Sequence, residues 1–443
     1  MEIIIPKDAK SIIDKLAEAG YEAYIVGGCV RDCLLGLSPD DWDITTNALP
    51  EQVKDLFRRT IDTGIEHGTV TVMIGNERYE VTTYRTDGAY SDGRHPDKVT
   101  FVPSLEEDLK RRDFTINAMA YNDREGLVDL FGGRDDIEKK TVRCVGNADE
   151  RFSEDALRMM RAVRFAAKLG YTIDDEALAS IKRLAPTLTK VSAERITTEL
   201  TKLLVSDHPE MLETLYETGL TKVFFPELDK AYDTPQVHPH HCFNVGRHIT
   251  ESVRNSKNDR IVRFAMLLHD IGKPDTLTID DKGITHFHGH PELSAKMGEE
   301  IMRRWKLDND TIFRVCRLIR HHDMGKGRKC TPEFVRKAVS VMEDDFPRLL
   351  EVMKADVLAQ SDYLRQEKLR NIEEYDKEYT RITEAGECCS LKTLAVGGRD
   401  LMELGIKPGP IMGEILGKLL DEVLEDPDLN DRDKLLTLAK EYL

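Results

Sequence analysis

The sequence lacks any long apolar run and any CxxC pair. No hydrophobic stretch approaches the roughly 20 residues that a membrane-spanning helix requires, and the mean hydropathy is −0.43. The eight cysteines are scattered, which argues against a disulfide framework and against a thiolate zinc site. The opening stretch MEIIIPKDAKSIIDKL has neither the basic start nor the cleavage site of a secretory signal. We therefore expect a cytoplasmic protein with no membrane segment.

An excess of basic residues is also missing. The chain carries 81 Asp and Glu against 64 Lys and Arg, a formal net charge of −17. This charge argues against a protein that coats nucleic acid without specificity, although a local basic surface can still hold RNA in a salt-sensitive manner. The length of 443 residues predicts about three or four domains.

A helical pattern is present at residues 153–170, SEDALRMMRAVRFAAKLG. Ser153 is a favourable N-cap, two carboxylates follow in the first turn, and Gly170 is a favourable stop. We predict a single helix here, whose apolar stripe consists of Leu157, Met160, Val163 and Phe165.

The charged residues of this run lie three apart and share another stripe of the predicted helix: Asp155, Arg158, Arg161 and Arg164. Asp155 offers only acceptors and Arg158 only donors. Side by side, they match the amino group and ring-nitrogen acceptor of cytosine or adenine, whereas uracil and guanine present the reverse pattern. The pair can therefore select C and A without a nucleic-acid template. A surface salt bridge on a solvated face is the alternative.

Residues 21–36, YEAYIVGGCVRDCLLG, predict a strand, a glycine turn and a helix. Gly27 and Gly28 let the backbone approach a ligand closely, and Arg31 lies where it can reach a triphosphate. An ordinary turn is the alternative.

Two carboxylates follow in DDWDI. Asp41 and Asp43 are two residues apart on a predicted strand and therefore face the same side. Paired carboxylates repel each other unless a cation lies between them, and hard oxygen ligands suit Mg²⁺. We favour a metal site over an exposed turn. Glu80, on the second strand of a hairpin predicted to turn at Gly75-Asn76, is a candidate third carboxylate; a solvent-facing Glu is the alternative.

Residues 85–100 are polar and predict a loop that can close over a nucleotide. The run LKRRDFTINAMAYN then places Arg111, Arg112 and Asp113 before a predicted apolar helix. Arg112 is a candidate phosphate or ribose ligand, and Asp113 is a candidate for a ribose hydroxyl or a metal. A salt bridge at the helix entry is the alternative.

In this order, GGCVRD, DWDITT, RRDFTINAMAY and SEDALRMMRAVRFAAKLG resemble the motifs of the bacterial class II tRNA nucleotidyltransferases, the CCA-adding enzymes and their poly(A) polymerase relatives. The resemblance covers the whole chain and is strongest over residues 21–175. It implies an α/β head with a small mixed sheet like that of polymerase β, followed by all-α neck, HD and tail domains. The implied boundaries are 1–145, 146–235, 236–360 and 361–443.

The resemblance also implies roles for individual residues. Gly28 and Arg31 match positions that contact nucleotide phosphates, and Asp41 and Asp43 match the carriers of the catalytic metals. Arg112 and Asp113 match a motif that handles ribose and phosphate. The remaining matches are the base template, Glu154, Asp155 and Arg158, and two further nucleotide contacts, Arg161 and Arg164. Glu194 and Arg195 match a neck position that braces the template helix.

Ten of the 13 histidines fall in residues 238–322. LLHDIGKP places His269 and Asp270 at the end of an apolar helix and resembles the HD superfamily of metal-dependent phosphohydrolases. On that resemblance, the metal ligands are His241, His269, Asp270 and Asp356, and a second metal can be held by His290 with His321 or His322. Imidazole with carboxylate suits a transition metal. A scaffold that has lost its activity is the alternative.

We therefore predict template-independent addition of CCA to the 3′ end of tRNA from CTP and ATP, with release of pyrophosphate and Mg²⁺ at Asp41 and Asp43. A phosphohydrolase activity of the HD region stays open, as do its metal and the oligomeric state. An enzyme that adds only A is one alternative. The other is an HD phosphohydrolase whose head only binds RNA. The tail, with a glycine–proline hairpin at residues 404–410, is expected to bind tRNA.

Overall fold

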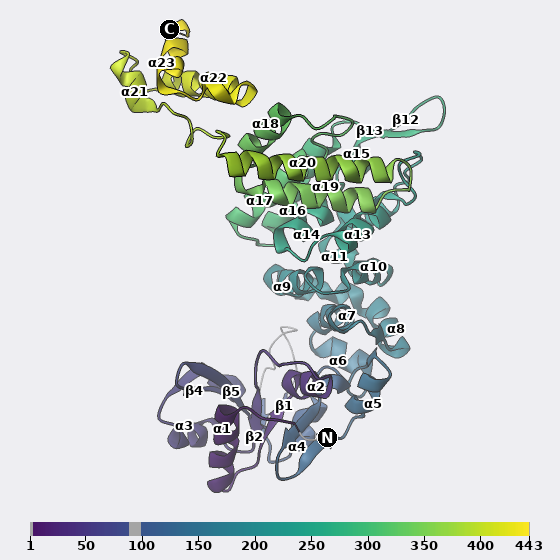
Figure 1. The fold of residues 1–443 in the computed structure, drawn as a ribbon. Coiled ribbons are helices and arrows are strands. Elements are labelled where there is room, and N and C mark those ends of the chain that lie inside the picture. Colours follow the sequence, from purple (N-terminus) through teal and green to yellow (C-terminus); the bar gives the residue numbers. More distant parts are fainter. Residues whose placement is uncertain (1–2, 88–98, 443) are drawn as a thin grey trace. The chain divides into compact units, whose positions relative to one another are not determined.

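The computed structural model describes residues 3–87 and 99–442. Its contacts divide the chain into two compact units, Met1–Pro226 and Glu227–Leu443. The first unit contains the sheet and the second is mostly helical (Figure 1). A mixed-sheet head followed by helices confirms the predicted fold class.

The first unit is built on a mixed sheet whose seven described strands lie in the order β3-β4-β5-β2-β1-β8-β9. Only the central β2–β5 pair is parallel, and every other neighbouring pair is antiparallel. The strands are β1 (Ala23–Val26), β2 (Ile44–Thr46), β3 (Thr60–Gly64), β4 (Thr69–Ile74), β5 (Glu77–Thr83), β8 (Met119–Asn122) and β9 (Gly126–Asp129). Two short pairs accompany it: β6 (Arg85–Asp87) with β7 (Val99–Phe101), and β10 (Thr141–Val142) with β11 (Thr172–Ile173).

Alternate side chains of β1 fill two cores, one on each face of the sheet. Ala23 and Ile25 pack with α1 (Lys7–Glu18) and α3 (Pro50–Leu56). Tyr24 and Val26 pack on the other face with Leu109 of α4 (Leu105–Lys110). The central strand is therefore held rigidly from both sides.

The predicted strand, glycine turn and helix are confirmed. β1 ends at Val26, Gly27 adopts a left-handed φ of 83°, and α2 (Gly28–Leu34) follows. The predicted hairpin is confirmed as well, since β4 and β5 pair in register from Ile74 opposite Glu77.

The single helix predicted from Ser153 is wrong. α6 (Ala148–Glu154) begins earlier, with Asn147 as its N-cap, and Ser153 lies inside it. The chain is extended at Asp155, and α7 (Leu157–Leu169) starts afresh and ends at Gly170 as predicted. The reason is local competition: the Asp155 carboxylate accepts a hydrogen bond from the Leu157 backbone N–H at 3.0 Å, which stabilises a cap instead of a continuous helix.

Two further predicted elements differ. Asp41 and Asp43 lie in irregular chain just before β2, not on the strand. The apolar helix predicted after Asp113 is a single 3-10 turn, Thr115–Asn117, followed by the buried strand β8. A short apolar run fits a buried strand as well as a helix, so its pattern alone could not separate the two. Residues 88–98 of the predicted loop lie outside the described residues.

The remaining helices of the first unit follow the sheet. They are α5 (Gly133–Glu138), α8 (Asp175–Leu184), α9 (Ala193–Leu204), α10 (Leu212–Glu217) and α11 (Thr221–Phe224). α7 packs mainly against α9, and its predicted apolar stripe is buried. This packing places the charged residues of α7 next to those of α9.

The second unit is a helical bundle whose centre is α14 (Arg260–Leu268). All of α14 after Arg260 is buried, because it packs against α13 (Val245–Asn255), α17 (Asn309–His321) and α19 (Phe346–Leu358). The other elements are α12 (Pro226–Tyr232), α15 (Lys273–Thr276), β12 (Leu277–Ile279), β13 (Thr285–Phe287), α16 (His290–Arg304), α18 (Pro332–Met342), α20 (Arg365–Ala385), α21 (Gly398–Glu403), α22 (Pro410–Glu425) and α23 (Arg432–Glu441). Within the described ranges, no helix has the length and apolar character to span a membrane.

Candidate functional site

The register of the sheet brings the predicted metal carboxylates and the glycine turn to one edge. β1 runs antiparallel to β2, with Ile25 opposite Ile44, and the Val26 N–H donates to the Asp43 carbonyl at 3.0 Å. Gly27, the next residue, is therefore a direct neighbour of Asp43. β2 is parallel to β5, with Ile44 opposite Val81, so Glu80 comes level with Asp43.

The electrostatics of this edge suit a cation. Asp43 is solvent-accessible, yet the pKa of its carboxyl is raised to about 6, mainly because the surrounding protein displaces water. The Arg112 guanidinium lowers this pKa, and the carboxylates of Glu80 and Asp41 raise it. Three carboxylates that disfavour one another's charge form a site that a divalent cation stabilises.

Arg112 lies beside the same edge. Its Nη1 is 3.2 Å from the position that a Cβ on Gly27 would take, and its Nη2 donates to the Asp108 carboxylate at 3.2 Å. Asp108 is fully buried and also accepts from Arg111 and from Thr45 of β2, so both arginines are tied to the sheet. The buried Arg112 Nε has no hydrogen-bond partner among the described residues and is a donor suited to an anion.

Asp113 is the centre of a buried network. One oxygen accepts from Arg161 at 2.8 and 2.6 Å, and the other accepts from the Phe114 N–H at 2.8 Å and from Asn117 at 3.3 Å. Burial alone would raise the pKa of the Asp113 carboxyl, but the guanidiniums of Arg161 and Arg158 outweigh burial and lower that pKa to about 2. The predicted ligand of ribose or metal thus has both oxygens engaged by the protein.

Arg31 and Arg164 are also engaged internally. Arg31 is 3% exposed and donates to Asp32 at 2.8 Å and to Asn117 at 2.5 Å. Arg164 is 8% exposed, lies 2.5 Å from Glu199 of α9, and covers the Phe165 ring at 3.8 Å. In this structure, both predicted nucleotide ligands stabilise the surroundings of the site.

Asp155 is held by an arginine from another helix. Arg195 of α9 donates to its Oδ2 at 2.7 Å and to its Oδ1 at 3.4 Å, and Oδ1 also accepts from the Leu157 N–H. A carboxylate oxygen has two acceptor positions, so Oδ2 keeps one position for a further donor. Sequence reasoning expected Arg195 to brace the template region but gave no sign that its partner would be Asp155.

Arg158 is likewise fixed in position by hydrogen bonds to other protein groups. Its Nη1 donates to Glu154 at 2.5 Å and to the Arg151 carbonyl at 3.1 Å, and its Nη2 donates to the Arg111 carbonyl at 3.1 Å. Asp155 and Arg158 do not bind each other through their side chains, contrary to the salt bridge considered as the alternative. The Arg111 contact connects α7 to the segment that carries Arg112, and so to the carboxylate edge.

The second unit contains a separate cluster of buried histidines and carboxylates. His248, His269 and Asp356 offer ligand atoms that lie within 4.8 Å of one another, and Asp270, His290 and His322 form a second such group. Asp270 links the two, since one oxygen is 3.3 Å from His248 and from His269 and the other is 3.2 Å from His290. The arrangement can hold two neighbouring metal ions.

The ring nitrogens of the four histidines are oriented for a metal. Each Nδ1 lies 2.6 to 3.3 Å from a backbone carbonyl, which can only accept, so each Nδ1 carries the hydrogen: His248 to Ala359, His269 to Met266, His290 to Phe287 and His322 to Ile319. The Nε2 atoms of His248 and His269 then face each other at 3.3 Å, as do those of His290 and His322. Two lone pairs at this distance repel unless a cation lies between them.

Several predicted ligands find their place here. His269, Asp270, Asp356 and His290 belong to the two groups, and His322 joins them while His321 does not. His241 lies outside both groups, beside His248, with their ring centroids 5.5 Å apart. Burial by itself lowers the pKa of His269, but Asp270 and Asp356 raise it to about 10, because the two carboxylates favour a positive charge at this position.

Sequence reasoning did not select His248. It lies on the buried face of α13 with Val245, Ile249 and Ser252, and that spacing was the available signal.

Comparison with known families matches three segments of the chain. Residues 23–143 match the poly A polymerase head domain. Residues 170–232 match the RNA and SrmB-binding site of polymerase A, and residues 277–439 match tRNA nucleotidyltransferase domain 2.

Individual relatives match over nearly the full length. The CCA-adding enzyme of Limosilactobacillus reuteri is 38% identical over 435 residues, which cover 98% of this chain and 96% of that protein. The CCA-adding enzyme of Ligilactobacillus salivarius is 36% identical over 440 residues, covering 99% and 96%. Among solved structures, the Bacillus stearothermophilus CCA-adding enzyme in complex with CTP is 31% identical, with a TM-score of 0.73 and coverage of 99% and 98%. The Thermotoga maritima CCA-adding enzyme complexed with tRNA shares the fold at 21% identity, with a TM-score of 0.62 and coverage of 99% and 96%.

Proposed function

The chain belongs to the family of the CCA-adding enzymes and is a tRNA nucleotidyltransferase, and on this basis we propose that its head builds the CCA end of tRNA from CTP and ATP. The observation that carries the proposal is the meeting of Asp41, Asp43 and Glu80 with the Gly27 turn at one edge of the sheet. Enzymes of this family use divalent metal ions, generally Mg²⁺. The three carboxylates are hard oxygen donors and fit such an ion, which would neutralise triphosphate charge and make the attacking hydroxyl more acidic.

The residues around this edge have complementary roles in the transfer. The backbone at Gly27 and Gly28 admits the triphosphate, and the Arg112 guanidinium donates to it. The 3′ hydroxyl of tRNA loses its proton to water as its oxygen attacks the α-phosphorus. The bond from that phosphorus to the bridging oxygen breaks, and pyrophosphate leaves with that oxygen. Such chemistry depends on positioning and charge neutralisation, which this residue set supplies.

Asp155 and Arg158 are proposed to read the incoming base. Oδ2 of Asp155 retains one acceptor position, and Arg158 has donors beyond those bound to Glu154 and to two carbonyls. These remaining positions match the amino group and ring nitrogen of C and A. Contacts with other protein groups fix the positions of both side chains before a nucleotide binds. U and G are rejected because, with either base, polar groups of the pair and of the base would stay without a hydrogen-bond partner.

We propose that the other predicted nucleotide ligands act indirectly, by holding neighbouring residues in place. Asp113 accepts hydrogen bonds from Arg161 and from Asn117, and Asn117 accepts one from Arg31. Arg164 pairs with Glu199, and the three arginines all lie over the Phe165 ring. They keep α7 at a fixed distance from the segment of Arg112, and so set the space available to one nucleotide.

The test is incubation of tRNA lacking CCA with CTP, with ATP, and with both. Full CCA addition requires CTP before ATP. Incorporation of A alone, and only onto tRNA that already ends in CC, would instead establish the A-only alternative. Asp41→Ala should abolish addition in every case.

We also propose that the histidine cluster of the second unit is a metal site of the HD type with phosphohydrolase activity. The facing Nε2 atoms support it, because their Nδ1 hydrogens are already given to carbonyls. Imidazole and carboxylate together suit a transition metal, which would supply a nucleophilic water at neutral pH. Asp270 would bridge two ions, and Lys273, whose Nζ is 2.6 Å from Asp270, would balance the carboxylate charge.

Paired variants separate the two sites. Asp41→Ala should abolish nucleotide addition and leave the transition-metal content of the histidine cluster and the phosphatase activity intact. Asp270→Ala should lose the bound transition metal, measured by elemental analysis, and keep addition. Loss of addition in Asp270→Ala alone would contradict two independent sites.

Partners, location and domain limits complete the proposal. We propose tRNA as the macromolecular partner, bound in part by the tail at residues 361–443, and a neck at 146–235 between head and HD region. A cytoplasmic location fits the eight cysteines, all of which are free in the described chain.

A further inference from the structure

A large cavity lies beside the histidine cluster in the second unit. It has a volume of about 1150 Å³ and includes His241, Lys273 and His290 in its wall, so it opens onto the proposed metal site. One phosphate group would leave most of this space empty. Small-molecule sites commonly measure about 300 to 1,000 Å³, so the cavity accommodates a ligand of at least nucleotide size.

The wall of the cavity is basic in a protein that is acidic overall. Three carboxylates line it, Asp323, Glu367 and Glu374, against six basic side chains, Lys273, Lys326, Arg328, Lys329, Lys368 and Arg370. The whole chain carries a net charge of −17. A local reversal of sign at a concave surface concentrates anions there.

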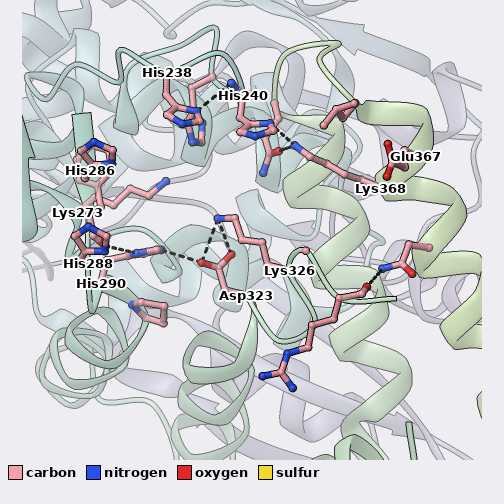
Figure 2. Close-up of a pocket in the computed structure, with 18 of the residues that line it drawn as sticks. His238, His240, Lys273, His286, His288, His290, Asp323, Lys326, Glu367 and Lys368 are labelled. Carbon is pink, nitrogen blue, oxygen red and sulfur yellow. Dashed lines mark hydrogen bonds and ion pairs between the residues drawn. The ribbon is translucent and has the colours of Figure 1, made fainter. Parts of the chain in front are cut away.

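Two of these lysines come from different segments and reach the same space (Figure 2). Lys368 of α20 donates to Gln360 at 2.6 Å and to Nδ1 of His240 at 2.9 Å. Lys326, after α17, donates to Asp323 at 3.2 Å. Ammonium groups with several donors each can exchange such contacts for phosphate oxygens.

Flat imidazole faces form another part of the wall. His238 and His240 are stacked with centroids 5.0 Å apart and planes inclined by 16°, and His286 and His288 are stacked at 5.7 Å and 6°. The Nζ atom of Lys368 lies 2.9 Å from Nδ1 of His240, so a basic side chain borders this stacked pair. Aromatic faces beside basic side chains are the combination that binds a nucleobase together with its phosphate.

We propose that this cavity binds a phosphorylated nucleotide, either free or as the end of an RNA strand. Lys326 and Lys368 hold the phosphate, and the base stacks on the His238–His240 pair. The inference rests on the proposed metal site only for the orientation of the phosphate towards Asp270; binding itself requires the cavity alone.

The experiment measures binding of adenosine 5′-monophosphate to the full chain by calorimetry, with and without added Mn²⁺. Ribose 5-phosphate and adenosine each lack one half of the ligand and should bind at least tenfold more weakly. Lys326→Gln with Lys368→Gln should weaken monophosphate binding at least tenfold. His238→Ala with His240→Ala should reduce it to the level of ribose 5-phosphate. Lys296→Gln, an exposed lysine of α16 outside the cavity, is the matched control and should bind normally.

The head needs its own control because it also binds nucleotides. Arg112→Gln should retain monophosphate binding; loss there, with retention in the double lysine variant, would overturn the proposal. Four-residue RNAs with and without a terminal phosphate distinguish the two sources of ligand, and tighter binding than the mononucleotide identifies a strand end. Metal uptake without monophosphate binding would overturn the cavity proposal and leave the metal site standing. Monophosphate binding without metal uptake would overturn the metal-site proposal and leave the cavity proposal standing.

Discussion

Removing Arg195, which binds the proposed base-reading carboxylate of Asp155, should weaken base selection. In Arg195→Met, Asp155 keeps only the Leu157 N–H and loses the partner that fixes its plane. The two side chains are only 21% and 14% exposed, and a hydrogen bond to a charged group contributes about 1.5–3 kcal/mol. If that free energy orients Asp155 in the transition state, kcat/KM for CTP and for ATP falls by about 10- to 150-fold. UTP gains nothing from Asp155, so discrimination against UTP falls by the same factor.

The assay is single-nucleotide addition to tRNA lacking its 3′ end, with each of the four triphosphates. Arg183→Met is the matched control, because it removes an arginine–aspartate pair with Asp149 whose side chains are 56% and 49% exposed. An exposed pair of this kind contributes about 0–1 kcal/mol, so addition should be unchanged. Arg195→Lys should restore part of the selectivity. Wild-type rates and unchanged UTP rejection in Arg195→Met would show that Arg195 does not orient Asp155 for base selection.

Three further outcomes follow from the head. Arg112→Gln should raise KM for CTP and ATP alike by about 10- to 100-fold with little change in base preference, since we propose that its guanidinium binds the phosphates. A change in base preference would contradict this role. Gly27→Ala should lower kcat/KM at least about tenfold, because a Cβ at a φ of 83° strains the turn and lies 3.2 Å from Arg112 Nη1. Asp113→Asn should destabilise the fold by about 2–3 kcal/mol at pH 7, since its folded pKa of about 2 lies below the unfolded value of about 3.9. That contribution is present above about pH 4 and is lost as the pH falls towards 2, so thermal melting of variant and wild type should converge in acid.

The sequence predicted those parts of the head that depend on local pattern. The strand, glycine turn and helix around Gly27 follow from alternation and a glycine pair, and the hairpin at Gly75 follows from period-two patterning. The interruption of the helix at Asp155 was not predicted. A conformation in which the Asp155 side chain accepts from a nearby backbone N–H differs only slightly in free energy from a continuous helix. Sequence periodicity does not report that balance.

Contacts between residues that lie far apart in the chain could not be predicted from the sequence either. The pairing of Asp155 with Arg195 and the engagement of Asp113 by Arg161 depend on how α7 packs against its neighbours. In the second unit, the choice of His322 over His321 depends on which face of α17 is buried. His248 could have been selected from its apolar neighbours, but only the folded bundle places its Nε2 opposite that of His269.

The most direct test of the base-reading pair is a crystal structure of this enzyme with Mg²⁺ and a non-hydrolysable CTP analogue. We expect the cytosine amino group within hydrogen-bond distance of Oδ2 of Asp155, the ring nitrogen at Arg158, and the triphosphate metal at Asp41 and Asp43. A nucleotide whose base lies elsewhere, with Asp155 and Arg158 too far from those aspartates for one nucleotide to span, would contradict this expectation.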